Sequence, residues 1–174
     1  MDFYKLISKG YDELYGEEQK IKHDIIKVNL NIKNEDLLLD VGCGIGADFN
    51  CKVIGIDPSM DLLQQKSTNR TNRNSIVIGN KKAMNKIQAA AENIPFKSNI
   101  FDKVISVTSI HNFNNIEQGI KEIKRVGKKD FAFSILKKAK NFEPIQSEIK
   151  NNFSIEKIID AKQDWIFICS KVFK

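Results

Sequence analysis

Short apolar runs recur along this chain, separated by stretches of mixed polarity. A continuous apolar run of about four to eight residues is typical of a strand buried on both faces of a parallel sheet. Five such runs predict five strands, at residues 37–41, 52–57, 87–90, 102–109 and 130–136. Two further segments, 154–161 and 164–172, flank a Lys162–Gln163 turn and predict a closing β-hairpin.

Helical periodicity fills most of the intervals between these strands. Residues 2–30 carry apolar side chains near helical spacing, with Gly10 and Gly16 as expected breaks. Pro58 and Ser59 open another helix, for which Ser59 is a candidate N-cap. Three more helical segments are expected, at residues 46–50, 115–126 and 143–152.

Strands that alternate with helices predict a parallel sheet covered on both faces. The expected fold class is therefore α/β, a Rossmann-like three-layer sandwich. Its sheet is mostly parallel and seven-stranded, with a C-terminal antiparallel hairpin. The 174 residues suffice for a single domain over 1–174, in which residues 1–30 form an N-terminal helical lid region. Tyr11 and Tyr15 are candidates for that lid or for ordinary packing.

The first predicted strand leads into a glycine-rich turn, Asp40-Val41-Gly42-Cys43-Gly44-Ile45-Gly46. Glycine suits a tight turn that a ligand approaches through its backbone. The spacing is G-x-G-x-G rather than the G-x-G-x-x-G of dinucleotide sites, and an acid precedes it. A carboxylate is of little use beside a pyrophosphate. The turn therefore favours a ligand that carries an ammonium group and no phosphate.

A second acid, Asp57, ends the second strand seventeen residues after Asp40. An acid at that position can accept hydrogen bonds from both hydroxyls of a ribose. The ordered set of acid, glycine turn and second acid predicts a site for an aminoacyl nucleoside. The alternative is a tight turn with two capping acids and no ligand.

Four segments carry a resemblance to a known family: LLLDVGCGIG, VIGIDPS, AENIPF and FDKVISVTSIHNF. They resemble the class I S-adenosylmethionine-dependent methyltransferases, and among them the methyltransferase type 11 group. The resemblance covers about residues 36–136. It implies methyltransferase activity with S-adenosylmethionine as the cofactor, and it leaves the methyl acceptor open.

The resemblance also implies a role for the residues that match its motifs. Asp40 and the backbone of Gly42, Cys43 and Gly44 would line the methionine part of the cofactor. Asp57 would bind the ribose hydroxyls. The adenine would be surrounded by residues of the next two loops: Pro58, Ser59, Met60, Ala91 and Glu92. Ser106 to His111 would line the floor near the reactive methyl group.

Two features depart from the family pattern. Ala90 stands where many relatives have an acid that bonds the adenine amino group, so adenine recognition is expected to be weaker or to use the main chain. The first crossover has only the residues 41–51, which is short for a parallel connection. Part of the cofactor pocket is therefore expected to be unusually open.

Methyl transfer from a sulfonium can proceed without a catalytic side chain. It is a direct displacement that needs alignment and the exclusion of water, with a base only where the acceptor must lose a proton early. His111 follows the fourth strand and is the candidate base or acceptor partner; the alternative is a histidine that orders the loop. His23 is expected at the surface. The three cysteines are interpreted as packing residues, and no metal site is expected.

The net charge of +6 is unevenly placed along the chain. Acidic residues are absent between Asp61 and Glu92, a stretch that holds Lys66, Arg70, Arg73, Lys81, Lys82 and Lys86. A basic surface attracts polyanions, although a solvated basic loop would have the same composition. ISVTSIHNF also resembles tRNA wobble-uridine methyltransferases. RNA is therefore a slightly favoured acceptor over a small metabolite.

Other functions remain open from the sequence. One is a methyltransferase-fold subunit that is inactive alone and depends on an activating protein partner. A weaker one is a nucleotide-dependent oxidoreductase, against which the glycine spacing and Asp40 speak. No apolar run approaches the roughly 20 residues of a membrane helix, and no signal peptide is recognised, so a cytoplasmic protein without membrane contact is expected.

Overall fold

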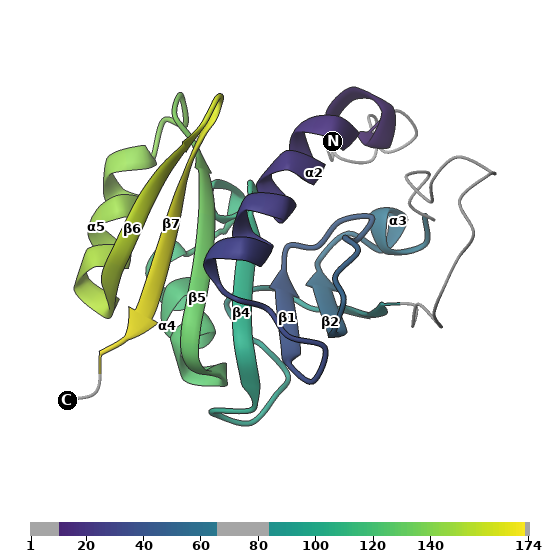
Figure 1. Ribbon diagram of the computed structural model, residues 1–174, viewed down its shortest axis with the longest axis horizontal. Helices are drawn as coiled ribbons and strands as arrows, with labels where there is room; N and C mark the ends of the chain where they lie inside the picture. The colour runs from purple at the N-terminus through teal and green to yellow at the C-terminus, as the bar shows by residue number, and fades with distance from the viewer. Residues whose placement is uncertain (1–10, 66–83, 173–174) are drawn as a thin grey trace.

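A computed structural model describes residues 11–65 and 84–172, with side chains from residue 16 on (Figure 1). Its strands form a seven-stranded sheet in the order β3-β2-β1-β4-β5-β7-β6. The strand bounds are Leu37–Val41 (β1), Lys52–Asp57 (β2), Asn85–Gln88 (β3), Phe101–Val107 (β4), Gly127–Leu136 (β5), Phe153–Ala161 (β6) and Asp164–Lys171 (β7). Strands β1 to β5 pair in parallel, and β7 is antiparallel to both β5 and β6. The predicted fold class is confirmed.

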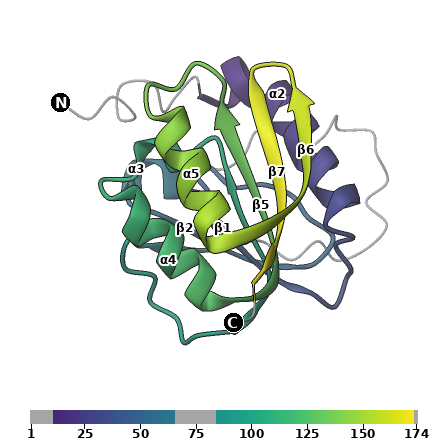
Figure 2. The same ribbon diagram turned by 90° about the vertical axis from the view of Figure 1, so that its left-hand side faces the viewer.

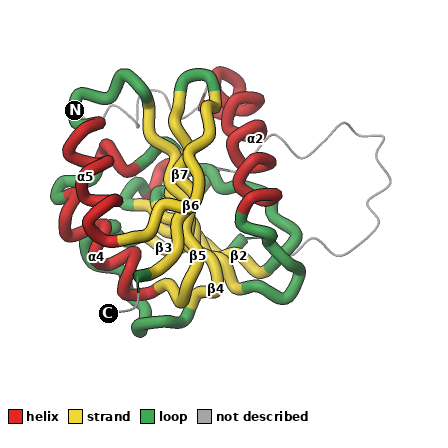
Figure 3. The backbone as a smooth tube through the Cα atoms, turned by 60° about the vertical axis from the view of Figure 1, so that its left-hand side comes forward, coloured by secondary structure: helices red, strands yellow, loops and turns green. Residues whose placement is uncertain are grey.

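Helices cover the sheet on both faces, which gives the three layers (Figures 2 and 3). The long helix α2 lies on one face, and α4 and α5 lie together on the other. Two short helices, α3 and η1, follow β2 and β4. The helix bounds are Tyr11–Asn29 (α2), Met60–Leu63 (α3), Ile110–Asn112 (η1), Ile116–Val126 (α4) and Phe142–Asn152 (α5).

The core beneath α4 and α5 is the larger of two apolar clusters. The ring centroid of Phe153 lies 4.6 Å from that of Phe131 and 5.2 Å from that of Phe133, separations that are usual for packed aromatic pairs. Ile120 and Ile123 of α4 are fully buried against them, as their spacing predicted. Apolar burial thus attaches α4 and α5 to this face of the sheet, and the same cluster includes Val104 of β4 and Ile110 of η1.

The opposite face is covered by α2, whose Ile26 is buried in the second cluster together with Leu30, the residue after the helix, and Phe49. The helix runs through Gly16, which is buried, so the predicted break at that residue is wrong. The expectation that His23 lies at the surface is also wrong. Its ring packs edge-on against Phe49 at 5.4 Å, and burial lowers its pKa to about 4.

The expected helix at residues 46–50 is not formed, and this is a correction to the sequence prediction. After the glycine turn, about five residues remain to return the chain along the five-residue strand β1. Five helical residues advance only about 7.5 Å, whereas five extended residues reach about 16 Å. An extended loop therefore makes this connection, and Phe49 takes the place of a helix against the sheet.

Two smaller differences concern the third strand. It runs from Asn85 to Gln88 rather than over 87–90, so Ala89 and Ala90 lie in the loop that follows. The break expected at Gly10 falls outside the described residues. Within the ranges 11–65 and 84–172, no helix is long and apolar enough to cross a membrane.

Candidate functional site

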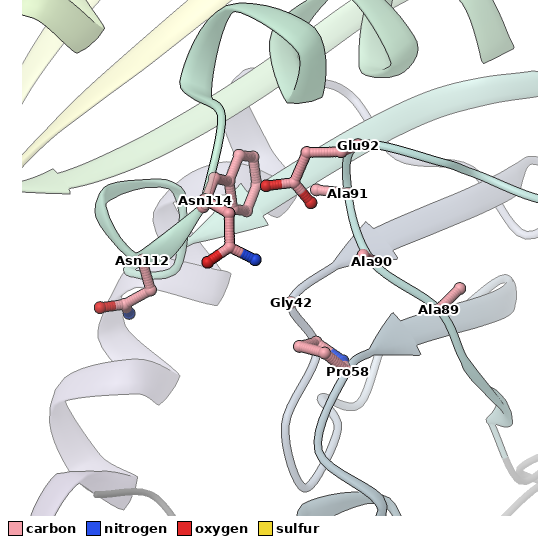
Figure 4. Close-up of a pocket in the computed structure, with 9 residues that line it drawn as sticks. Gly42, Pro58, Ala89, Ala90, Ala91, Glu92, Asn112 and Asn114 are labelled. Atoms are coloured by element: carbon pink, nitrogen blue, oxygen red, sulfur yellow. The ribbon is translucent and has the colours of Figure 1, made fainter. Parts of the chain in front are cut away.

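A pocket opens at the carboxyl ends of the parallel strands (Figure 4). Loops after four strands meet there: Gly42 follows β1, Pro58 follows β2, Ala89 follows β3 and Asn112 follows β4. Strand β1 lies between β2 and β4 in the sheet, so the strand order runs outward from β1 to β2 and β3 on one side and to β4 and β5 on the other. Such a reversal of strand order is where open α/β sheets bind ligands.

The glycine turn forms the side of this pocket next to β1. Gly42, Gly44 and Gly46 have φ of 75°, 52° and 93°, a left-handed region that side chains with a Cβ rarely adopt. A Cβ on Gly42 would collide with the Ser109 side chain. Glycine at this position therefore allows both the turn and the close approach of the loop after β4.

The carboxylate of Asp57 ties the ends of β1 and β2 together. Its Oδ2 accepts a hydrogen bond from Gly44 N at 2.9 Å, and its Oδ1 accepts one from Ser59 N at 2.8 Å. The side chain is 7% exposed. Ser59 in turn caps α3, as predicted, through its Oγ and Leu62 N. One acid thus fixes the glycine turn and the start of α3.

Asp40, in β1, is a buried acid with a shifted pKa. Burial and the nearby Asp57 raise its pKa to about 7, while Lys86 lowers it. A carboxylic acid that is half protonated near neutral pH gains from a cation placed beside it, because the cation favours the ionised form. This part of the turn therefore suits a ligand with a positive charge.

Lys86, in β3, binds the backbone of the glycine turn through its ammonium group. Its Nζ donates to Ile45 O at 2.5 Å, to Gln65 O at 3.1 Å and to Leu63 O at 3.4 Å. The sequence prediction counted Lys86 among the charges of a basic surface, and this was wrong. Its ammonium group is turned inward and bonds backbone carbonyls of the glycine turn and of the segment around the end of α3.

The loop after β3 forms the opposite wall. Ala89 N donates to Asp57 O at 3.2 Å, which keeps this loop beside the end of β2. Ala90 and Ala91 present only small apolar side chains to the pocket. The Glu92 carboxylate accepts from Asn115 N at 3.0 Å, at the N-terminus of α4. Glu92 thus joins this wall to α4.

The loop after β4 completes the pocket with Asn112, Phe113 and Asn114. Gly119 of α4 leaves room for the ring of Phe113, which a Cβ at that position would meet. Ser106, predicted to lie near the reactive centre, is fully buried and shares a 2.7 Å hydrogen bond with Ser109. It supports the loop from behind.

His111 lies in η1, within this loop. Burial lowers its pKa, while the Asp164 carboxylate raises it and Lys22 lowers it further. The imidazole is therefore neutral at neutral pH and could accept a proton. Its Nδ1 is buried with no hydrogen-bond partner among the described residues. Asn141 Nδ2 donates to the His111 carbonyl at 3.1 Å and fixes the backbone of η1.

The structure brings together part of the predicted set. Gly42, Pro58, Ala91 and Glu92 line the pocket, and Asp57 underlies it. Ala89 and Asn114 also line it and were not singled out from the sequence, where small and amide side chains carry no clear signal. Met60 is 43% exposed and does not line this pocket.

Comparisons with known proteins show the family to which this chain belongs. The family model described as "Methyltransferase domain" matches residues 39–135. The uncharacterized protein MJ1252 of Methanocaldococcus jannaschii is 29% identical over 93% of this chain, which spans 66% of that protein. "Putative methyltransferase YrhH" of Bacillus subtilis is 30% identical over 77% of this chain and 72% of its own length. The chain thus spans just under two thirds of MJ1252.

A solved structure shares the fold over nearly the whole chain. It is that of a protein from Methanococcus maripaludis named as a putative S-adenosyl-L-methionine-dependent methyltransferase. The TM-score is 0.75 at 18% identity, with 98% of this chain and 92% of that chain covered. At this identity the likeness concerns the arrangement of strands and helices alone.

Proposed function

We propose that the pocket of this chain, which belongs to the methyltransferase-domain family, binds S-adenosylmethionine and that the chain transfers a methyl group from it. The observation that carries the proposal is the arrangement of two acids around a glycine turn. Asp40 and Asp57 are buried on either side of the turn at the point where the strand order reverses. Such an arrangement suits a ligand that combines an ammonium group with a ribose.

The residues present fit this cofactor. Asp57 would accept hydrogen bonds from the ribose hydroxyls while it holds Gly44 N and Ser59 N, because each carboxylate oxygen can accept more than one. Asp40 would favour the ammonium of the methionine part. Ala90 and Ala91 would leave room for the adenine, which the main chain of this wall would recognise. When bound, S-adenosylmethionine supplies an electrophilic methyl group on a sulfonium.

On the acceptor side, the chain needs mainly to align the nucleophile and to keep water out. His111 is our candidate for taking up a proton, because its lowered pKa keeps the imidazole neutral. Asn112 and Phe113 would shape the wall that the acceptor meets. Acceptors that lose no proton before the displacement would leave His111 dispensable.

Cofactor affinity is expected to depend on pH through Asp40. Its pKa of about 7 in the free protein means that the ligand must displace a proton below that pH. The dissociation constant should then fall about tenfold for each pH unit between pH 5.5 and 7, and level off above. Calorimetric titrations across this range measure the slope. Asp40→Asn should bind more weakly with no such slope; a slope equal to that of wild type would contradict the assignment.

RNA remains the slightly favoured acceptor, on the basic composition of the sequence and the ISVTSIHNF segment. Most of that basic stretch, residues 66–83, lies outside the described residues. Lys86 is turned inward and does not add to a basic surface. A small-metabolite acceptor and a subunit that needs an activating protein partner both stay open as predictions.

Transfer of a labelled methyl group tests the proposed function and the acceptor together. The chain is incubated with methyl-labelled S-adenosylmethionine and either total RNA or a protein-free metabolite extract, with Asp57→Ala as the control. Label in RNA that falls steeply between about 50 and 200 mM salt would support an RNA acceptor. Label that appears only in metabolites, at a rate independent of salt, would overturn the RNA acceptor but would leave the proposed methyl transfer standing. No label in either, with the cofactor bound, would favour dependence on a partner.

A further inference from the structure

A buried polar cluster joins α2 to the sheet beside the pocket. Lys22 is 1% exposed and Asp164 is 0% exposed. Lys22 Nζ lies 2.9 Å from Asp164 Oδ1 and donates to Thr108 Oγ1 at 2.9 Å. Thr108 Oγ1 donates to Asp164 Oδ2 at 2.9 Å, and Ser134 Oγ donates to the same oxygen. Four segments that are distant in sequence thus meet in one hydrogen-bonded group.

The cluster lies at the ligand-binding edge of the sheet. Thr108 directly follows β4, and Asp164 begins β7 opposite Leu136, the last residue of β5. Since β5 is parallel to β4, Asp164 is at the carboxyl ends of both strands. A buried ion pair gains little stability over apolar residues of similar volume, because both charges lose their hydration. Its position at this edge suggests a role besides stability.

Thr108 has a φ of 53°, in the left-handed region. A β-branched residue rarely adopts this conformation, and strain of this kind persists only where the surroundings impose it. At Thr108 both the backbone and the side chain are held by hydrogen bonds. Thr108 N donates to Ser134 O at 3.0 Å, and its Oγ1 is held between Lys22 and Asp164.

The turn at Thr108 sets the direction of the residues that follow. Ser109 Oγ reaches across to Val41 O at 2.9 Å, and its side chain packs against Gly42. The η1 helix with His111 begins at the next residue. A different φ at Thr108 would move Ser109 away from the glycine turn and re-aim His111.

We propose that Lys22, Asp164 and Thr108 act as positioning residues for the proposed methyl-transfer site. They hold the loop after β4 so that Ser109 supports the glycine turn and His111 faces the acceptor side. This inference rests on the proposed function for what the loop binds, but the positioning itself is a property of the free chain. The docking of α2, which supplies Lys22, thereby becomes part of the site.

Thr108→Gly tests the proposal, because glycine accepts a φ of 53° without strain and the variant is expected to fold. It removes the hydroxyl and leaves the backbone free to take other conformations. Amide hydrogen exchange at residues 108–112 of the free protein should rise about tenfold or more. The dissociation constant for S-adenosylmethionine should rise about tenfold, the equivalent of one good hydrogen bond. Thr108→Ser keeps the hydroxyl and should restore both values to within about threefold of wild type.

Lys103→Met is the matched control. It removes a partly buried ion pair to Asp130, 2.6 Å long, toward the amino end of β4. It should leave exchange at 108–112 and cofactor affinity unchanged. Wild-type exchange at 108–112 in Thr108→Gly, or equal losses in the control, would overturn the positioning role. If wild type itself bound no cofactor, that would count against the proposed function, and the exchange experiment would still decide the role of Thr108.

Discussion

Asp57→Ala is expected to weaken S-adenosylmethionine binding by about a hundredfold to a thousandfold, through two lost hydrogen bonds from the ribose to a charged acceptor. The same change leaves the buried Gly44 N and the partly buried Ser59 N without their acceptor, so the glycine turn and the start of α3 loosen as well. The loss of binding affinity should be larger than the fraction of unfolded protein in the variant can account for. Calorimetric titration together with thermal unfolding measures both effects.

Two further variants separate the effects of changing Asp57. Asp57→Asn keeps the size of the side chain and one acceptor oxygen, so it should fold better than the alanine variant yet still bind weakly. Asp160→Ala removes an exposed carboxylate from the hairpin, where it pairs with Lys137 at 2.7 Å, and should bind as wild type does. Wild-type affinity in a folded Asp57→Ala variant would show that the ribose lies elsewhere.

Gly42→Ala is the second change with a large expected effect. An alanine at a φ of 75° is strained by about 1–2 kcal/mol. The new Cβ would also collide with Ser109, which hydrogen bonds and packing hold in place. Overpacking of this kind adds about 1–3 kcal/mol, so the free energy of unfolding should fall by about 2–5 kcal/mol in all. Denaturant titration measures the change.

Gly44→Ala provides a matched comparison. Its φ of 52° imposes similar backbone strain, but the nearest atom to the new Cβ is Leu62 Cδ1 at 3.9 Å, an ordinary contact. The loss should therefore stay near about 1–2 kcal/mol. Adding Ser109→Gly to Gly42→Ala should recover part of the stability by removing the collision. Equal losses in the two single variants would contradict the close packing of Ser109 on the glycine turn.

The features predicted correctly from the sequence share a local cause. The buried strands, the helix at 116–126 and the cap at Ser59 follow from the period of apolar residues and from backbone chemistry within a few residues. The glycine turn and Asp57 could be found for the same reason. Each needs a particular residue type at a fixed distance from a strand end, and the resemblance to a known family added their order.

The features missed depend on segments far apart in the chain. Lys22 and Asp164 are separated by most of the sequence, and nothing local distinguishes Lys22 from the other lysines of α2. Lys86 looked like one charge of a basic run until the fold placed the carbonyls of Ile45 and Gln65 around it. The sequence shows that the first crossover is short, but only the paired positions of β1 and β2 show that a helix at 46–50 cannot span the distance.

Calorimetric titration of the purified chain with S-adenosylmethionine, its demethylated product and NAD tests the central claim most directly. The account predicts micromolar binding of the first two, no binding of NAD, and loss of binding in Asp57→Ala. Failure of a folded wild-type chain to bind either of the first two, or a preference for NAD, would contradict it.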